Sequence, residues 1–351
     1  MAGPKALGII EGCAEAAGSL LKLFSGIVSD RLRRTKLLVT GGYGIAALAR
    51  PLLALAASWP MVLVLRFADR TGKGLRTAPR DALLALSITP EQRGLAFGFH
   101  RAMDNTGAVV GPLLATALLG FRLPLREILL WTIVPGVIAV GLTLAIREPA
   151  RAISVEPARF SSNLRGFPVS FKRYLLVLAL FTLGNSSNMF LLLRAKDMGL
   201  PEYQVPLLWA LVSAVAAIGS TPLSALSDRY GRKQLIVAGW LVYAMFYLCL
   251  GWIAVTWLLW PLFAIYGLFM AATEGTEKAL VADLAPQESL GTAYGWFNLT
   301  AGMMLLPASL LFGALWQTGG ALTAFAIASG CAFVAAGLLV FWVNPARPRA
   351  N

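Results

Sequence analysis

Charged residues are scarce in this sequence. Asp, Glu, Lys and Arg make up 13% of the 351 residues, about half the share of an ordinary soluble domain. Histidine occurs once and cysteine three times, and Cys13, Cys249 and Cys331 each lie in an apolar run. These positions indicate packing residues rather than disulfide bonds or metal ligands. We therefore expect no metal site and no cofactor.

Enzyme motifs are lacking as well. The chain has no paired-aspartate metal motif, no Ser/His/Asp set and no P-loop. His100 and Asp104 are the only pair that a membrane-embedded enzyme, such as a lipid-modifying transferase, would use. We expect a protein that is not an enzyme, with the membrane-embedded enzyme as an alternative.

Apolar residues, by contrast, make up 58% of the chain and gather in continuous runs. Each run is close to the roughly 20 residues that a helix needs to cross hydrocarbon, and the runs do not alternate as barrel strands do. We predict an all-α membrane protein with about 11 transmembrane helices. The runs are Leu7–Val28, Leu37–Ala57, Met61–Leu86, Ala96–Gly120, Ile128–Ile146, Tyr174–Leu193, Val205–Leu226, Leu235–Val255, Trp257–Val281, Gly291–Trp316 and Ala321–Val343.

The net charge of +13 is explained by where the basic residues lie. Of the 30 Lys and Arg residues, 18 fall in alternate connections, including the turns at Arg31 and Arg229 and the end of the chain. Cytoplasmic loops of membrane proteins carry such an excess. We therefore predict a multi-pass protein of the bacterial inner membrane with a cytoplasmic C-terminus, and we expect no binding to nucleic acid.

The runs form two related halves. A polar interval predicts a cytoplasmic linker at 148–172 between a bundle at 1–147 and a bundle at 173–351. A shift of 198 positions places Ser29-Asp30-Arg31 on Ser227-Asp228-Arg229, and a shift of 197 places Gly94 on Gly291. The first half then holds five spans and the second six, so we expect that the first span of the repeated unit is missing from this sequence. Two pseudo-symmetric bundles are typical of one large class of transporters.

Two loops at equivalent places carry the clearest motif. Gly26-Ile-Val-Ser-Asp30-Arg31-Leu-Arg33-Arg34 follows the first span, and Ser224-Ala-Leu-Ser-Asp228-Arg229-Tyr-Gly231-Arg232 follows the seventh. Both resemble the signature loop of the major facilitator superfamily, although Arg33 and Ser224 each replace an expected glycine. The resemblance implies a cytoplasmic gate. Its residues would be Gly26, Asp30, Arg31, Arg34, Asp228, Arg229, Gly231 and Arg232. A plain basic loop is the alternative.

The third span is unusually charged for a membrane helix. Charges at such depth are costly and usually functional. Leu65-Arg66-Phe67 resembles the fourth-helix motif of the superfamily, whose arginine assists proton transfer, although Arg70 stands where a glycine is usual. Asp69 is either part of this site or a structural partner of Lys73 at i,i+4.

The fourth span contains both a motif of small residues and a group of titratable residues. Gly107-Ala-Val-Val-Gly111-Pro112 resembles the fifth-helix motif of antiporters, and ordinary helix packing is the alternative. His100, Arg101 and Asp104 lie just upstream. A carboxylate removed from water in a bundle takes up a proton more readily, so we interpret Asp104 either as a proton or substrate contact or as a buried partner of Arg101.

Further carboxylates lie in the first and ninth spans. Glu11 and Glu15 lie at i,i+4 in the first span and would face a cavity. Glu274 and Glu277 lie in the ninth, where Lys278 offers Glu274 a structural pair. We take these four carboxylates, with Asp104, as candidates for proton coupling.

The resemblance covers the whole chain and implies the fold and activity of the superfamily. We expect a secondary transporter that acts as a monomer and exports a small amphipathic solute or drug by alternating access in exchange for protons. Its partners would be that solute, protons and the lipid bilayer. The alternatives are a proton-coupled importer of a metabolite and an inactive truncated transporter.

Overall fold

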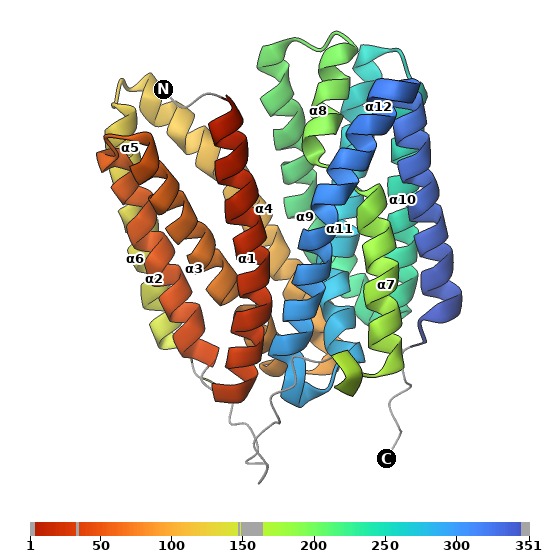
Figure 1. Ribbon diagram of the computed structural model, residues 1–351, viewed down its shortest axis with the longest axis horizontal. Helices are drawn as coiled ribbons and strands as arrows, with labels where there is room; N and C mark the ends of the chain where they lie inside the picture. The colour runs from red at the N-terminus through yellow and green to blue at the C-terminus, as the bar shows by residue number, and fades with distance from the viewer. Residues whose placement is uncertain (1–3, 33–34, 147, 149–163, 345–351) are drawn as a thin grey trace. The chain divides into compact units, whose positions relative to one another are not determined.

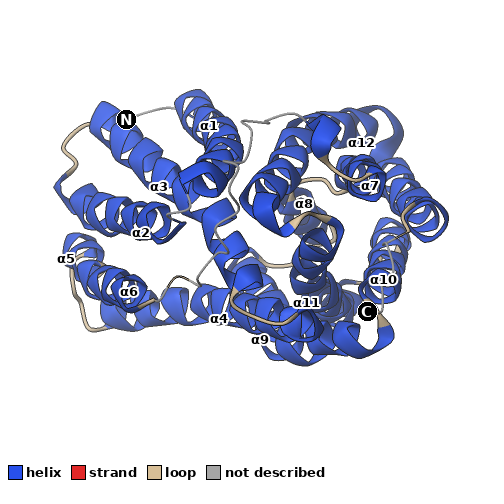
Figure 2. Ribbon diagram, turned by 90° about the horizontal axis from the view of Figure 1, so that it is seen from below, coloured by secondary structure: helices blue, strands red, loops and turns tan. Residues whose placement is uncertain are grey.

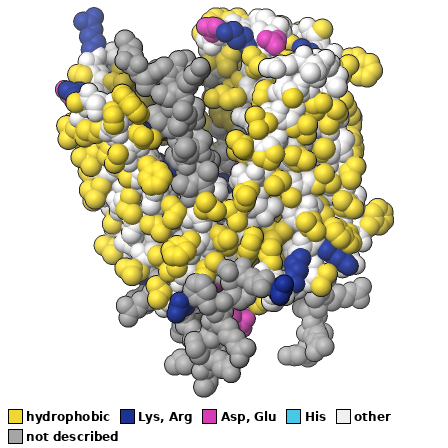
Figure 3. Space-filling model, viewed as in Figure 1, with side chains coloured by type: hydrophobic (Ala, Val, Ile, Leu, Met, Phe, Trp, Pro, Cys, Tyr) yellow, Lys and Arg dark blue, Asp and Glu magenta, His cyan; other side chains and the backbone are white. Residues whose placement is uncertain are grey.

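The computed structural model describes residues 4–32, 35–146, 148 and 164–344, without the side chains of residues 4–17. All regular elements in this part of the chain are helical, which confirms the predicted all-α class (Figure 2). Eight helical segments among the described residues are long and apolar enough to cross a membrane. Outside the grey residues, hydrophobic side chains are spread widely over the face shown in Figure 3, as lipid contact requires.

The described chain forms twelve α-helices and six short 3₁₀ turns. Figure 1 labels the α-helices. The α-helices are α1 (Pro4–Leu32), α2 (Thr35–Leu52), α3 (Trp59–Leu86), α4 (Arg93–Gly120), α5 (Leu125–Trp131), α6 (Ile133–Ala145), α7 (Val169–Gly184), α8 (Asn188–Asp197), α9 (Val205–Tyr230), α10 (Arg232–Trp252), α11 (Leu259–Leu284) and α12 (Leu290–Trp342). The 3₁₀ turns are η1 (Leu53–Leu55), η2 (Pro90–Gln92), η3 (Leu164–Gly166), η4 (Glu202–Gln204), η5 (Thr256–Leu258) and η6 (Gln287–Ser289).

Several predicted spans are divided or joined differently in the structure. The span predicted at 174–193 is broken between α7 and α8, where Asn185 leaves the helical conformation at φ −94° and ψ 82°. The last two predicted spans follow one another through a kink at Gly320, whose φ of 81° favours glycine. The structure therefore retains the apolar runs but changes where helices begin and end.

The helices form two compact units. Unit 1 comprises Met1–Ser87, Pro112–Gly166 and Ala285–Gly302, and unit 2 comprises Ile88–Gly111, Phe167–Leu284 and Met303–Asn351. Unit 1 thus includes the start of α12, from the predicted second half, and unit 2 includes the first part of α4, from the predicted first half. The division at the linker into ancestral halves stays a prediction.

In unit 1, α3 packs between α1 and α2 through small residues. A Cβ atom added to Gly72 would lie 2.7 Å from the carbonyl oxygen of Gly42, and one added to Gly74 would lie 2.7 Å from Cβ of Leu21. Ser25 of α1 also donates a hydrogen bond to the carbonyl oxygen of Gly74 at 2.9 Å. Glycine is required here because a larger side chain would separate the helices.

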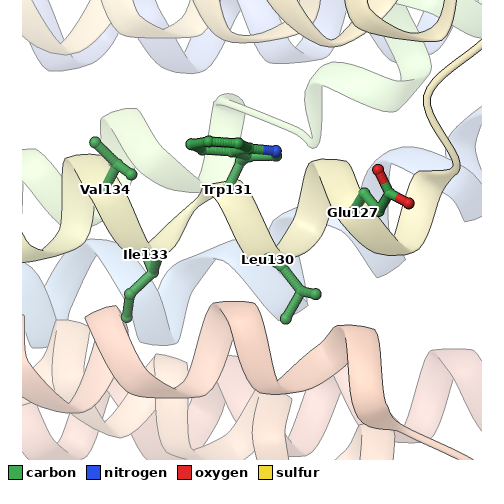
Figure 4. A pocket seen from close by; sticks show the side chains of 5 residues that line it. All are labelled: Glu127, Leu130, Trp131, Ile133 and Val134. Carbon is green, nitrogen blue, oxygen red and sulfur yellow. The ribbon is translucent and has the colours of Figure 1, made fainter.

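Unit 1 also has a shallow pocket where α5 gives way to α6. Its volume is about 250 Å³, and its lining residues are Glu127, Leu130, Trp131, Ile133 and Val134 (Figure 4). Because four of the five lining side chains are apolar and no set of polar groups converges there, we do not take this pocket as the functional site.

In unit 2, aromatic side chains fill the core. Phe181 stacks on Trp240 with ring centroids 4.2 Å apart, and Tyr243 lies 4.2 Å from Tyr247. Two tyrosine hydroxyls bind residues on either side of the break between α7 and α8. Tyr243 donates to the carbonyl oxygen of Gly184 at 3.0 Å, and the Tyr266 hydroxyl lies 2.9 Å from Oδ1 of Asn188. These bonds satisfy polar groups that the interrupted helix would otherwise leave buried.

Candidate functional site

The carboxylate of Asp30 binds the first turn of α12 within unit 1. Its oxygens accept hydrogen bonds from the backbone N–H groups of Gly291 at 3.0 Å and Thr292 at 2.6 Å, and from the Thr292 hydroxyl at 2.8 Å. Asp30 is only 6% exposed. A helix N-terminus has unsatisfied N–H groups and a partial positive charge, so a buried carboxylate is favourable here. We call this contact the Asp30 clamp.

Close backbone contact accompanies the Asp30 clamp. A Cβ atom added to Gly26 would collide with the carbonyl oxygen of Gly291, and one added to Gly291 would lie 2.8 Å from Oδ1 of Asp30. The predicted gate residue Gly26 therefore lies against the helix end that Asp30 binds.

A matching contact, the Asp228 clamp, holds the first turn of α4 within unit 2. The Asp228 carboxylate accepts from the backbone N–H groups of Gly94 at 2.9 Å and Leu95 at 2.8 Å. Gly94 and Gly291 are the residues that the repeat aligns. The two clamps therefore follow the sequence duplication.

Arginines and a further carboxylate support the Asp228 clamp. Arg232 donates to Asp228 and lies 3.1 Å from Asp283 of α11, which in turn pairs with Arg93 at 2.8 Å. Arg232 also donates to the carbonyl oxygen of Pro90 at 2.7 Å. Asp283 and Arg93 were missed in the sequence because they are distant from the motif.

The remaining predicted gate residues are Arg31, Arg34, Arg229 and Gly231. Arg31 and Arg229 are exposed, and Arg34 lies outside the described residues. Gly231 separates α9 from α10 with a φ of 100°, which favours glycine.

A second polar group lies deeper in unit 2, between α4 and α11. Arg101 lies 3.6 Å from Asp104 and 3.6 Å from Glu274, while His100 Nδ1 is 3.8 Å from Asp104. Three predicted residues of α4 therefore lie close to a predicted carboxylate of α11. Because Arg101 is near two carboxylates, loss of the charge on one would leave it attracted to the other alone.

Glu277 lies one turn further along α11. It accepts a hydrogen bond from the indole N–H of Trp240 at 2.9 Å. Trp240 itself is fully buried. This partner could not be recognised from the sequence, because Trp240 lies in the apolar run of α10.

The charged positions of α3 belong to unit 1. Asp69 is bound by Arg50 of α2 at 2.9 Å, so the structure records a partner other than the Lys73 considered from spacing. Arg66 and Lys73 are exposed, and Arg70 is half-buried. Arg76 lies 4.2 Å from the centre of the Tyr43 ring. Arg50 and Tyr43 were not anticipated.

Two groups of predicted residues receive little support from contacts. Glu11 and Glu15 lie in α1, but their side chains are outside the described part of the chain. Gly107, Gly111 and Pro112 are exposed, and a Cβ atom added to either glycine would meet no described atom within 4 Å. Close helix packing at this motif stays a prediction.

No group of three or more His, Cys, Asp or Glu residues that could hold a metal ion occurs among the described residues. The polar groups instead consist of carboxylates with arginines, tryptophan or helix N-termini.

Comparisons with known proteins agree on one family. The family model of the Major Facilitator Superfamily matches residues 2–306 and 174–351. An uncharacterized MFS-type transporter of Methanocaldococcus jannaschii, MJ1317, is 33% identical over 346 residues, which is 97% of this chain and 86% of that protein. The multidrug resistance protein MdtH of Salmonella newport is 26% identical over 302 residues, covering 84% of this chain and 73% of MdtH.

The fold is shared with a solved structure. The proton:xylose symporter XylE superposes with a TM-score of 0.78 at 15% identity, over 96% of this chain and 86% of that one. At this identity the likeness concerns the fold alone. The family model and the relative from M. jannaschii show that the chain belongs to the major facilitator superfamily of membrane transporters.

Proposed function

We propose that the chain exports a small amphipathic solute by alternating access and that proton uptake drives this export. The two clamps are the observation that carries the proposal. α4 and α12 each contribute residues to both units, and each clamp binds the first turn of one of these helices. In each clamp a single carboxylate accepts all the hydrogen bonds from the helix N-terminus, so these bonds can form and break together. In this proposal the two clamps are a matched pair of contacts that would release α4 and α12 during a change of state.

The group around Arg101 is suited to proton coupling. Glu274 lies 3.6 Å from Arg101, and Asp104 lies at the same distance. When a proton neutralises the Glu274 carboxylate, Arg101 loses one of its two attractions and is drawn to Asp104. Proton uptake by Glu274 would thereby weaken the contact between Arg101 of α4 and Glu274 of α11.

Two resemblances favour export. MdtH is named for multidrug resistance, and the Gly107 to Pro112 segment resembles the antiporter motif. Import of a solute together with protons would use the same groups. The direction in which protons move when solute is added distinguishes import from export.

The test uses everted membrane vesicles, in which the interior is acidified by respiration and reported by a pH-sensitive dye. An exporter that exchanges solute for protons releases protons when a solute is added, so the dye fluorescence recovers. We expect recovery with the wild type and its loss in Glu274→Gln. Lys196→Gln, which alters only the exposed Lys196–Glu202 pair, is the control. Equal recovery in Glu274→Gln would remove Glu274 from the coupling mechanism, and a further acidification on solute addition would indicate import.

A further inference from the structure

We propose that the pocket along α5 and α6 is a binding groove for one phospholipid of the surrounding bilayer, phosphatidylethanolamine. The groove has a volume of about 250 Å³ and lies within unit 1. Its headgroup end carries two charges, and the rest of its lining is apolar. Binding of this lipid does not depend on which solute the chain transports or in which direction.

Two neighbouring rows of side chains line the groove. The backbone stays helical across the junction of α5 and α6, and residues three, four and seven positions apart share a face of a helix. One row is formed by Glu127, Trp131 and Val134, and the other by Leu130 and Ile133. Figure 4 shows the first row above the ribbon and the second below it.

Each row begins with a charged residue at the same end of the helix. Glu127 starts the first row, and Arg126, four positions before Leu130, starts the second. Both charged side chains are exposed, and among the described residues neither has an ion-pair partner. Adjacent residues are about 100° apart on a helix, so a carboxylate and a guanidinium flank the entrance to the groove.

The place of these two charges in the membrane span matches the headgroup region. The apolar segment is 21 residues long, from Leu125 to Ala145. Such a helix is about 31 Å long, close to the roughly 30 Å of bilayer hydrocarbon. Arg126 and Glu127 are its second and third residues, so they lie where hydrocarbon meets headgroups. Val134 lies about 14 Å from the start of the span, at the depth of acyl chains.

The groove is open to the surroundings of the helix. Only 11% of the most apolar window of this span is buried, and its mean hydropathy is 2.2. Trp131 is 61% exposed and Val134 is 45% exposed. In a bilayer, acyl chains cover an apolar surface of this kind. The groove can therefore hold an acyl chain while the two charges bind the headgroup of the same lipid.

The two charges fit a zwitterionic headgroup with a primary ammonium. Arginine binds phosphate oxygens through paired N–H groups, and a carboxylate accepts hydrogen bonds from an ammonium. Phosphatidylethanolamine supplies both partners. The choline of phosphatidylcholine has no N–H group to donate, and phosphatidylglycerol has no cation for Glu127. Charge complementarity therefore favours phosphatidylethanolamine among these three phospholipids.

The experiment measures quenching of Trp131 fluorescence by lipids with brominated acyl chains, because bromine quenches an indole only at close contact. The full chain is placed in phosphatidylcholine nanodiscs that contain a minor fraction of brominated phosphatidylethanolamine, phosphatidylcholine or phosphatidylglycerol. The chain has ten tryptophans, so the signal of Trp131 is obtained by subtracting that of Trp131→Phe. The variants are Glu127→Gln, Arg126→Gln and Arg126→Lys. The matched control is Glu202→Gln, whose exposed carboxylate pairs with Lys196 in unit 2.

We expect brominated phosphatidylethanolamine to quench Trp131 about threefold or more strongly than the other two lipids, a modest factor because ion pairs at a hydrated surface are weak. Glu127→Gln should abolish this preference, whereas the control Glu202→Gln should keep it. Arg126→Gln should weaken quenching by phosphatidylethanolamine. Arg126→Lys should restore part of it, because the positive charge remains.

Three results would overturn the proposal. Quenching by phosphatidylethanolamine no stronger than by phosphatidylcholine would mean unselective contact with the bilayer. Stronger quenching by phosphatidylglycerol would assign the groove to an anionic lipid. A preference for phosphatidylethanolamine that survives Glu127→Gln would restrict Glu127 to stabilising the first turn of α5. Because quenching does not require transport, absence of proton release in the vesicle assay would reject the proposed function alone.

Discussion

Replacing Asp30 by Asn should release the start of α12 from unit 1. The carboxylate accepts three hydrogen bonds there, from Gly291 N, Thr292 N and the Thr292 hydroxyl. Asn keeps one acceptor oxygen, so the amide –NH₂ faces at least one N–H donor. The substitution also removes the negative charge from the helix N-terminus.

The magnitude follows from these losses. A buried hydrogen bond to a charged group contributes about 1.5–3 kcal/mol, and a charge at a helix N-terminus contributes about 0.3–1 kcal/mol. We therefore expect a loss of about 2–4 kcal/mol, which changes the equilibrium between bound and released α12 by about 30- to 1,000-fold. Asp30→Glu keeps the charge and should lose less.

The assay is a distance measurement by pulsed electron paramagnetic resonance within unit 1. Spin labels are placed at Leu32→Cys and Glu288→Cys, which are both exposed, after Cys13, Cys249 and Cys331 have been replaced by Ser. The wild type should give one short distance, and Asp30→Asn should add a longer population. A distance distribution unchanged by Asp30→Asn would refute the reasoning, because the clamp would then contribute little to holding α12.

Four further substitutions or labels test other contacts. Gly26→Ala introduces a methyl group that collides with the Gly291 carbonyl, so the same spin labels should report separation of α1 and α12, whereas Gly41→Ala, with open space at its Cβ position, should not. Asp283→Asn removes the carboxylate that pairs with Arg93 and Arg232, and we expect a loss of about 1–3 kcal/mol of stability in thermal unfolding. In a variant that already lacks both arginines, the same substitution should cause no further loss. Trp240→Phe leaves the buried side of Glu277 without its donor and should lower stability by about 1–3 kcal/mol, with Trp252→Phe on the exposed surface as the control. Impermeant thiol reagents should label Arg31→Cys and Arg229→Cys from the same side of the membrane, and labelling from opposite sides would contradict the duplicated topology.

The sequence predicted the helical class, and it singled out Asp30 and Asp228 as gate residues at equivalent places, a role that stays a prediction. A long apolar run predicts a membrane helix by itself, and the aligned positions of Asp30 and Asp228 are visible without coordinates. The residues that bind these carboxylates were harder to predict from the sequence. Gly94 and Gly291 had been aligned with one another, but only the structure shows that each lies against the carboxylate of the opposite copy.

Other features depend on contacts that no local pattern reveals. Arg50 approaches Asp69 from α2, and Trp240 reaches Glu277 from an apolar helix. The break between α7 and α8 did have a signal, the polar residues from Asn185 to Asn188, but the apolar residues around them favoured one continuous span. Spacing rules describe neighbours on one helix, whereas these contacts join residues of different helices.

The sequence distance across the two clamps has a consequence for biogenesis. Asp228 binds Gly94 across 134 positions, whereas Asp30 binds Gly291 across 261. During translation the chain is made from its N-terminus, so Asp30 enters the bilayer long before the ribosome has produced the helix end that it will hold. A nascent chain halted before α12 would thus lack the N–H groups and the Thr292 hydroxyl that bind Asp30 in the finished protein.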